Sequence, residues 1–317
     1  MTDTSTKSAG IDVAKAKLDI AVHGQHERLQ VANNLRGFKA LVTHLRRGQV
    51  ARIGVEATGG YERGVVAHLR AAGFAVVVLQ PVQVRAFARA QLRRAKNDAI
   101  DAVLIAAFTA MIADVKPAPD ERLAQLAPQL TFIEQVEEDI VRLKTRCEKV
   151  EERRLRRLLL ADIDRLKGRR KAELARLIAA LRQHQDLARK LDLVLSIPGI
   201  GERTAVSLIV RMPELGSVSR EQAAALAGLA PFDADSGQHK GERHIAGGRS
   251  RLRRSVFAAA LPAAFRWNTA LIALYNRLLA RGKAHKAALT ACARKLVVYA
   301  NTVVARGTPW LEATPAV

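Results

Sequence analysis

The stretch Ser8–Val22 reads SAGIDVAKAKLDIAV and contains two short apolar runs with only three residues between them. Two runs this close together, Ser8–Val13 and Lys17–Val22, predict the strands of a hairpin. A third strand is predicted at Glu27–Val31, after a short polar stretch. The chain is therefore expected to begin with β-structure.

Helical and strand patterns alternate after this hairpin. An Asn cap and apolar residues at helical spacing predict a helix over Asn34–Leu45. The remaining predicted elements are a buried strand at Ile53–Ala57, a helix at Tyr61–Ala72, a strand at Ala75–Leu79, and helices at Val82–Arg94 and Asp98–Ile112. This β-β-β-α-β-α-β-α order is typical of a ribonuclease-H-like α/β domain, which we expect over residues 1–115.

The composition sets limits on the class of protein. The chain has 317 residues, enough for two or three domains, and its 49% hydrophobic residues exclude wholesale disorder. Its two cysteines, Cys147 and Cys292, are far apart, which excludes a disulfide scaffold or a cysteine zinc site and favours a reducing compartment. No apolar signal segment and no spanning run of ~18–20 residues is visible. The sequence predicts a soluble intracellular protein without membrane contact.

The charge indicates a polyanionic partner. The chain carries 52 Lys and Arg against 30 Asp and Glu, a net charge of +22. Nucleic acid fits this excess, because each neutralised phosphate releases counterions. The net charge is +8 over residues 1–110, +4 over 120–195 and +10 over 196–317, so the two ends hold most of the binding potential. Aromatic residues are 4% of the chain, so we do not expect base stacking to dominate. A basic solvated surface is the alternative.

The middle of the chain follows a heptad-like pattern. After a linker marked by Pro117 and Pro119, apolar residues recur at a 3-4-3-4-3 spacing. These positions are Ile133, Val136, Ile140, Leu143, Cys147 and Val150. The pattern resumes from Leu155 to Leu181, with Gly168 as the one expected break. We predict a coiled-coil dimerisation arm over residues 120–192, and the alternative is a pair of helices packed on their own domain.

The last part of the chain, residues 193–317, is expected to form a mostly helical domain. Ala-rich helices are predicted at Glu221–Ala227, Arg251–Phe265 and Lys283–Val304. A Gly-rich insert, Gly228–Gly248, interrupts them.

A turn motif opens this helical domain. The run Leu195–Ala205 reads LSIPGIGERTA and predicts a helix-hairpin-helix. Pro198, Gly199 and Gly201 would let backbone N–H groups approach a phosphate, and the following helix adds its positive N-terminal dipole. Such a turn contacts the nucleic-acid backbone without reading bases. The alternative is a plain turn between two helices.

Four carboxylates occupy positions that suit metal-dependent chemistry. Asp12 lies inside the first strand, where an unpaired charge is costly, and Glu56 lies near the end of the strand at Ile53–Ala57. Asp98 and Asp101 are three residues apart and share one face of their helix. Such oxygen ligands can hold Mg²⁺ for phosphoryl transfer. Each acid also has a structural explanation, as a hairpin residue, a strand end or a solvated first helical turn.

The Gly-rich insert contains a serine and a basic cluster. On its chemistry alone, Ser236 is expected to be a turn serine. The basic residues in and after the insert are Lys240, Arg243, Arg249, Arg251, Arg253 and Arg254. We predict that this cluster contacts phosphates, and a solvated basic face is the alternative.

Taken together, these motifs resemble the DEDD transposases of the insertion-sequence 110 family. The motifs are GIDV at 10–13, EATGGYE at 56–62, NDAIDA at 97–102, IPGIG at 197–201, and GLAP with SG at 228–237. The resemblance runs from about residue 8 to 305. It implies that Asp12, Glu56, Asp98 and Asp101 bind Mg²⁺ in a domain like the RuvC junction resolvase. It also implies that Ser236 is a nucleophile that attacks a DNA phosphate and forms a transient 5′-phosphoserine link.

The resemblance further implies an RNA-guided DNA transposase or recombinase of the bacterial cytoplasm, acting at the nucleoid. Its partners would be donor DNA, target DNA and a structured guide, the bridge RNA of its own element. Its active form would be a pair of dimers, in which the serine of one subunit joins the carboxylates of another. Two other hypotheses stay open from the residues alone. One is an Mg²⁺-dependent structure-selective nuclease in which Ser236 is only structural, and the other is a nucleic-acid architectural protein without enzymatic activity.

Overall fold

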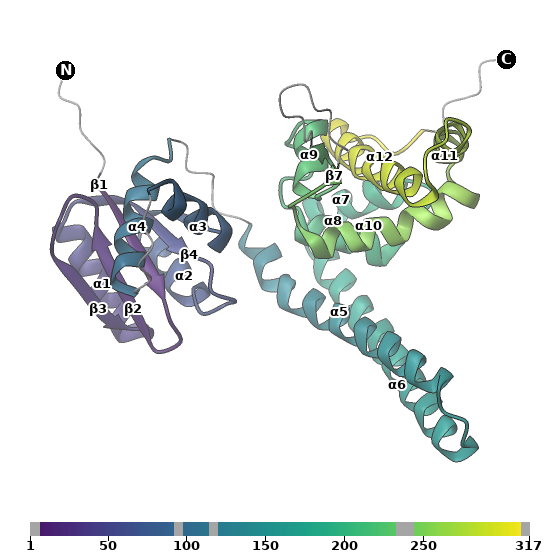
Figure 1. The fold of residues 1–317 in the computed structure, drawn as a ribbon, viewed down its shortest axis with the longest axis horizontal. Helices are drawn as coiled ribbons and strands as arrows, with labels where there is room; N and C mark the ends of the chain where they lie inside the picture. The colour runs from purple at the N-terminus through teal and green to yellow at the C-terminus, as the bar shows by residue number, and fades with distance from the viewer. Residues whose placement is uncertain (1–6, 92–97, 114–119, 233–243, 312–317) are drawn as a thin grey trace. The chain divides into compact units, whose positions relative to one another are not determined.

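The computed structural model describes residues 7–91, 98–113, 120–232 and 244–311, with 98–100 described by their backbone alone. It divides into two compact units, Met1–Ala118 and Pro119–Val317 (Figure 1). The first unit is an α/β domain and the second is mostly helical. Three of the predicted site residues, Ser236, Lys240 and Arg243, lie outside the described residues.

The first unit is built on a five-stranded sheet with the order β3-β2-β1-β4-β5 (Figure 1). Its strands are β1 (Lys7–Val13), β2 (Lys17–Val22), β3 (Arg28–Ala32), β4 (Val50–Glu56) and β5 (Ala75–Leu79). The first three strands pair antiparallel, whereas β4 pairs parallel with both β1 and β5. The element order agrees with the sequence prediction, so the mixed α/β class of this unit is confirmed.

Helices cover both faces of this sheet. They are α1 (Leu35–Arg47), α2 (Arg63–Ala71), α3 (Pro81–Ala90) and α4 (Asp98–Ala110). The predicted cap is present, because the side chain of Asn34 accepts a hydrogen bond of 3.0 Å from the N–H of Gly37. Residues alternate across β1: Ile11 packs in one core with α1 and α2, while Gly10 faces α4.

The second unit begins with two long helices, α5 (Glu121–Glu148) and α6 (Arg153–Arg182), which pack together as a hairpin (Figure 1). The predicted seam lies inside this hairpin, where Val136 and Ile140 of α5 share a core cluster with Ile163 of α6. Much of the seam of α5 is therefore covered by α6 of the same chain. A contact of this hairpin with another subunit stays a prediction.

The predicted break at Gly168 is wrong, because α6 runs through this residue and the chain turns at 149–152 instead. A glycine inside a helix costs roughly 1 kcal/mol. The neighbouring ion pair between Lys167 and Asp164 (2.8 Å) offsets part of that cost. The turn forms where Glu152 caps α6, since its carboxylate accepts hydrogen bonds of 2.8 and 2.9 Å from two N–H groups of the first turn.

Shorter helices form the rest of the second unit. They are α7 (Gln185–Leu195), α8 (Glu202–Arg211), α9 (Arg220–Leu226), α10 (Ser250–Pro262), the π-helical turn η1 (Ala263–Trp267), α11 (Thr269–Ala280) and α12 (His285–Arg306). The three predicted Ala-rich helices correspond to α9, to α10 with η1, and to α12. Helices α8 and α12 lie in a shared apolar core, to which Leu177 and Leu181 of α6 contribute.

A short ribbon of two antiparallel strands, β6 (Pro231–Phe232) and β7 (His244–Ile245), lies at the base of the Gly-rich insert. Further along, the chain bends by 96° between η1 and α11. Among the helices that the structure describes, none is by itself long and apolar enough to cross a membrane. The bent pair of Ser250–Trp267 and α11 reaches the length and composition of a span only when its two helices are taken together.

Candidate active site and nucleic-acid interface

Two glycines on neighbouring strands let α4 lie directly on the sheet. Gly10 of β1 and Gly54 of β4 are partners in the parallel register. A Cβ atom at Gly10 would lie 2.2 Å from the nitrogen of Ala106 and 2.3 Å from the oxygen of Ala102. A Cβ atom at Gly54 would lie 1.8 Å from Oγ1 of Thr109. The close packing of α4 against both strands therefore requires glycine at these positions.

Helix α4 runs antiparallel to these two strands. Arg52, two residues before Gly54, donates a hydrogen bond to the carbonyl of Ile112, just beyond the end of α4. Gly54 itself meets Thr109 and Ile105, which come earlier in the helix. Two residues of strand span about 6.6 Å, which equals about four residues of helix. The first turn of α4 consequently lies at the carboxyl ends of β1 and β4.

Asp12 and Glu56 occupy these strand ends. Each lies two residues after its glycine, so strand alternation puts both on the face that α4 covers. The register pairs Ile11 with Val55, which makes Asp12 and Glu56 neighbours one step further along. Both residues are half-buried.

The first turn of α4 brings the other two predicted acids to the same edge of the sheet. Ala102 and Ile105 touch the sheet at Gly10. Asp98 and Asp101 lie four residues before Ala102 and Ile105, so they continue the same stripe of the helix. Asp101 is half-buried, and the side chain of Asp98 lies outside the described part of the chain. The fold thus gathers four acidic positions from two strands and one helix.

The chemistry of this donor set fits Mg²⁺, which takes carboxylate oxygens as ligands. Within the described side chains, no three His, Cys, Asp or Glu groups stand in positions that would already hold a metal ion. This statement leaves out the fourth acid of the set, Asp98, because its side chain lies outside the described part of the chain. The backbone therefore supports a metal site at this edge, and metal binding itself stays a prediction.

A fifth carboxylate, not singled out from the sequence, lies opposite Asp12. Asp19 of β2 is the partner of Asp12 in the antiparallel register, so both side chains leave the sheet on the same face. Asp19 accepts a hydrogen bond of 2.6 Å from Gln30 and forms an ion pair of 3.1 Å with Lys17. The signal for it was present in the sequence, as the one acidic residue inside the apolar run Lys17–Val22.

The loop after Glu56 is held by the carboxylate of Glu62. This side chain accepts hydrogen bonds from the N–H groups of Gly60 (2.8 Å) and Thr58 (3.1 Å). Burial raises the pKa of Glu62, but the backbone hydrogen bonds together outweigh burial and hold the pKa below its ordinary value. Ionised Glu62 therefore stabilises the turn that follows the strand end.

We expect Glu62→Gln to lower the stability of the first unit at neutral pH and to lose this effect in acid. Because the folded pKa is depressed, the stabilisation is fully present above the ordinary pKa of 4.5 and is lost as the pH falls through the lowered folded value. Thermal unfolding of wild type and variant at neutral and at acidic pH measures the difference. Glu27→Gln, at an exposed position, is the control. An equal Glu62 effect at both pH values would contradict this account.

The predicted nucleic-acid turn lies between α7 and α8, and α8 begins directly after its N-cap, Gly201. Gly199 has a φ of +94°, and a Cβ atom there would lie 2.3 Å from the Cβ of Ala263. Glycine at 199 is thus required by the backbone and by packing on η1. The Cβ position of Gly201, in contrast, faces open space. The two glycines of the turn therefore differ, because Gly199 is packed against η1 and Gly201 is open, and phosphate binding at the turn stays a prediction.

Two arginines of the predicted phosphate-binding cluster pair with acids elsewhere in the chain. Arg249 makes a bidentate pair with Glu214, with distances of 2.7 and 2.8 Å. Arg254 pairs with Glu138 of α5 at 2.6 Å. These acids partly neutralise both guanidinium groups, so a phosphate would have to compete with them.

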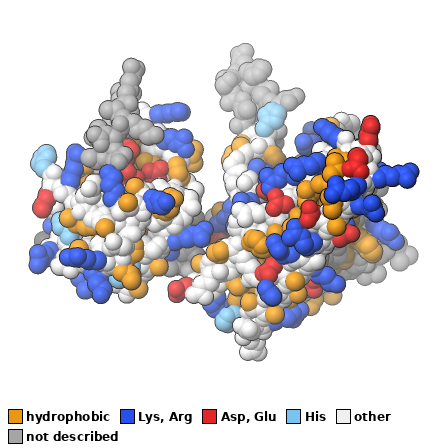
Figure 2. Space-filling view, turned by 90° about the horizontal axis from the view of Figure 1, so that it is seen from below, with side chains coloured by type: hydrophobic (Ala, Val, Ile, Leu, Met, Phe, Trp, Pro, Cys, Tyr) orange, Lys and Arg blue, Asp and Glu red, His pale blue; other side chains and the backbone are white. Residues whose placement is uncertain are grey.

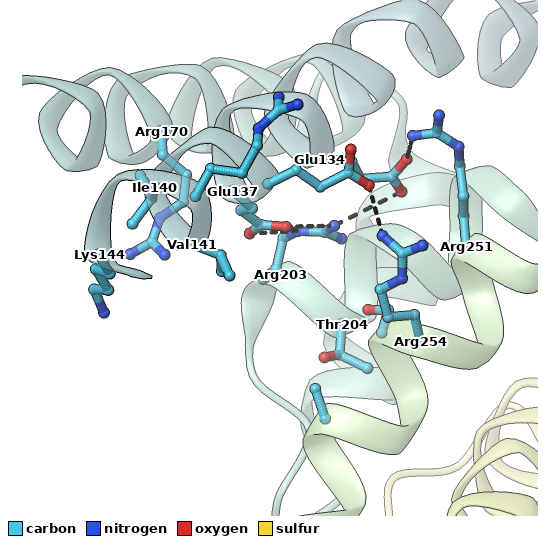
Figure 3. Close-up of a pocket in the computed structure, with 14 residues that line it drawn as sticks. Glu134, Glu137, Ile140, Val141, Lys144, Arg170, Arg203, Thr204, Arg251 and Arg254 are labelled. Carbon is cyan, nitrogen blue, oxygen red and sulfur yellow. Dashed lines mark hydrogen bonds and ion pairs between the residues drawn. The ribbon is translucent and has the colours of Figure 1, made fainter. Parts of the chain in front are cut away.

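Glu134 of α5 is the centre of a larger network (Figure 3). It is buried and accepts hydrogen bonds of 2.7 Å from both Arg211 and Arg251. Arg203 lies 3.7 Å from it and pairs with Glu137 at 2.9 Å. The network joins α5 to α8 and α10 beside a cavity of about 720 Å³. Because breaking a buried pair leaves an uncompensated charge, these arginines hold the second unit together.

The two ends of the Gly-rich insert are fastened to each other. Arg253 donates hydrogen bonds to the carbonyls of Gly228 (3.2 Å) and Gly247 (2.7 Å). Strands β6 and β7 pair just inside these contacts. The described residues on either side of 233–243, Phe232 and His244, are therefore neighbours on the helical unit.

An α/β sheet with acidic residues at its strand ends, joined to a basic helical unit, fits an enzyme that cuts or transfers nucleic-acid strands. A sequence model of the DEDD transposases of IS110 matches residues 9–152, and the model described as transposase IS116/IS110/IS902 family matches residues 191–276. The chain therefore belongs to the IS110 family of transposases, which are DNA recombination enzymes.

Several named proteins are similar to this chain. Two pilin gene-inverting proteins, from Moraxella bovis and Moraxella lacunata, are each 26% identical to it over 95% of its length and 96% of theirs. The insertion element IS110 uncharacterized 43.6 kDa protein of Streptomyces coelicolor is 35% identical over 38% of this chain and 30% of its own.

Proposed function

We propose that this transposase is an RNA-guided recombinase that cuts and exchanges the DNA strands of an insertion element. In this proposal Asp12, Glu56, Asp98 and Asp101 hold Mg²⁺, and Ser236 is the nucleophile. The observation that carries the proposal is the convergence of the four acidic positions at one edge of the sheet, through the close packing of α4 on its two glycines.

The carboxylates would act by position and charge. When bound, Mg²⁺ would stabilise the negative charge that develops on the phosphate oxygens during phosphoryl transfer. Asp12 and Glu56 extend from a buried sheet, so their backbone is rigid. Asp98 and Asp101 depend on how α4 packs, because the helix sets their distance from the strand ends.

The proposed chemical step conserves the number of phosphodiester bonds. The hydroxyl oxygen of Ser236 forms a bond to a DNA phosphorus, and the bond from that phosphorus to the 3′ oxygen breaks. The serine proton ends on the leaving 3′ oxygen, which yields a 3′-hydroxyl and a 5′-phosphoserine. The 3′-hydroxyl of another strand then attacks the phosphoserine, and the serine recovers its proton. Serine is a weak nucleophile at neutral pH, so the proposal places it against the carboxylates of another subunit.

Charge and the similar proteins support the proposed partners. A net charge of +22 suits an assembly that holds DNA together with a guide RNA. Inversion of a pilin gene, the activity named for two similar proteins, needs exchange at two DNA sites, which fits a pair of dimers. Val141, Leu155 and Leu158 are exposed on the α5–α6 hairpin and support a contact between subunits there.

The test is purification with and without co-expressed RNA from the sequence flanking the gene, followed by incubation with Mg²⁺ and DNA that carries the element ends. Wild type is expected to form recombinant DNA and a serine-linked DNA adduct, and to need both the RNA and Mg²⁺. Ser236→Ala is expected to form neither product, because the attacking oxygen is gone. Denaturing gels that separate protein-linked from free DNA measure the adduct.

Ser217→Ala is the matched control, since Ser217 is exposed in the same unit and its hydroxyl only donates to the carbonyl of Glu214. This variant should keep full activity. If Ser236→Ala still cleaves DNA, the serine step is wrong and the alternative holds, a structure-selective Mg²⁺-dependent nuclease with a structural Ser236. Recombination without any RNA would remove the guide from the proposal.

A further inference from the structure

The turn η1 has an unusual distribution of side chains. It buries its two small residues, Ala263 and Ala264, and exposes its two aromatic ones, Phe265 at 51% and Trp267 at 54%. Full burial of such a side chain contributes roughly 1.5–3 kcal/mol relative to full exposure, so about half of that contribution is missing at each ring. The other tryptophan of the chain, Trp310, packs at 4.5 Å from the ring of Tyr299. The η1 rings therefore leave about half of their surface open to a ligand.

The surroundings of these rings are cationic. Residues 244–311 contain twelve Lys and Arg and no Asp or Glu. Arg266 lies over the ring of Trp267 at 5.0 Å from its centre. Lys283 is exposed nearby in the sequence. His285 stacks near Phe265, with 6.2 Å between ring centres, and is held by a hydrogen bond of 2.6 Å with the hydroxyl of Tyr275, whose ring packs edge-on to Phe265 at 5.0 Å. Figure 2 shows that Lys and Arg outnumber acidic side chains over the visible face of this unit. The patch, which we call the aromatic corner, comprises Phe265, Arg266, Trp267 and His285.

The aromatic corner adjoins the Pro-Gly-Ile-Gly turn. Ala263 of η1 lies where a side chain at Gly199 would be, and Asn268 donates a hydrogen bond of 3.2 Å to the carbonyl of Pro198. Asn268 also caps α11, since its side chain accepts a hydrogen bond from the N–H of Leu271. The corner is therefore fixed rigidly beside the open N-terminus of α8, where a phosphate can bind.

We propose that the aromatic corner binds unpaired nucleotides, whose bases stack on Trp267 and Phe265 while their phosphates meet the cationic side chains and the turn at Gly201. Stacking needs a free base face, which the interior of a duplex does not offer. The charge of the region favours a polynucleotide over an apolar protein partner. The inference rests on the proposed function, because exchange of strands leaves bases transiently unpaired.

Fluorescence tests this directly, because the chain has only two tryptophans. In Trp310→Phe, emission comes from Trp267 alone, and a stacked base should quench it. The probes are a short single-stranded DNA, the RNA of the same sequence, and the corresponding blunt duplex, all without Mg²⁺. We expect both single strands to quench the emission and the duplex to leave it nearly unchanged. The single strand that quenches the emission more strongly shows whether DNA or RNA is the ligand.

Affinity measurements with otherwise wild-type protein give a second readout that does not depend on Trp310→Phe folding. Trp267→Ala should weaken single-strand binding by about tenfold, the usual effect of losing one stacking ring. Phe132→Ala, an exposed aromatic residue on α5, is the control and should bind like wild type. Single-strand affinity that is unchanged by Trp267→Ala, or equal quenching by the duplex, overturns the inference. Emission that changes with protein concentration alone would instead make the corner a contact between copies of the chain.

The inference and the proposed function can fail separately. Asp12→Asn should quench like wild type, because stacking needs no catalysis. If quenching occurs but the serine-linked adduct never forms, the proposed function is wrong and the binding of nucleotides at the aromatic corner is supported. If the adduct forms without any quenching, the inference about the aromatic corner is wrong and the proposed function is supported.

Discussion

Asp12→Asn is expected to reduce DNA cleavage by on the order of a thousandfold or more while the first unit stays folded. The amide has nearly the shape of the carboxylate but lacks its charge, so Mg²⁺ would lose a ligand. Asp12 stands opposite Asp19 across β1 and β2, and two facing carboxylates repel each other. Because the side chain keeps its size, the first unit should still unfold in one cooperative transition on heating. Cleavage rates against Mg²⁺ concentration, together with circular dichroism on heating, measure both effects.

Two further variants decide what an Asp12 effect means. Asp164→Asn removes a carboxylate from an exposed ion pair on α6 and should keep full activity. Asp19→Asn removes a charge from the position opposite Asp12, where the carboxylate is bound by Gln30 and Lys17. It should impair cleavage far less than Asp12→Asn. Equal losses at both positions would mean that charge at this strand pair matters in general, and the assignment of Asp12 to the metal would be wrong.

Gly10→Ala is expected to destabilise the first unit by about 3 kcal/mol and to impair activity with it. The new methyl group would lie 2.2 Å from the backbone nitrogen of Ala106 and 2.3 Å from the oxygen of Ala102, and a backbone cannot rotate away as a side chain can. Helix α4 would have to move off the sheet. Its first turn contains Asp98 and Asp101, so the four acidic positions would separate.

Gly168→Ala is the matched control for this change. The Cβ position of Gly168 faces open space inside α6, so alanine there should stabilise the helix by about 0.5–1 kcal/mol. Both tryptophans lie in the second unit, so their emission should be unaffected by Gly10→Ala while circular dichroism reports the loss in the first. A Gly10→Ala protein with wild-type stability and activity would refute the close packing of α4 as the basis of the site.

The basic cluster shows what charge in a sequence leaves open, and its contact with phosphates stays a prediction. Arg249, Arg251 and Arg254 are three of six neighbouring cations, a pattern that indicates phosphate binding. In the structure they pair with Glu214, Glu134 and Glu138, which are 35 to 117 positions away. The amino-acid composition includes these acids, but it does not show which cation each of them pairs with. Arg266 of the aromatic corner, in contrast, belongs to residues 244–311, a stretch of the sequence without Asp or Glu.

Local patterns were sufficient for the elements of the first unit. Strand alternation around Asp12, the Asn34 cap and the helical spacing after it depend on residues within a few positions of one another, so the sequence alone predicts them. The same holds for the placement of acids at strand ends and at a helix start. These features determined the class of the fold and four candidate ligands.

Long-range packing decided the rest. That α4 runs antiparallel to β1 and β4, and so places its first turn at the carboxyl ends of these strands, follows from contacts at Gly10 and other residues far apart in the chain. The uninterrupted course of α6 and the exposure of Trp267 likewise depend on which distant groups arrive beside them. A sequence states which side chains are available, but only the folded chain determines their neighbours, because each contact is set by all the others at once.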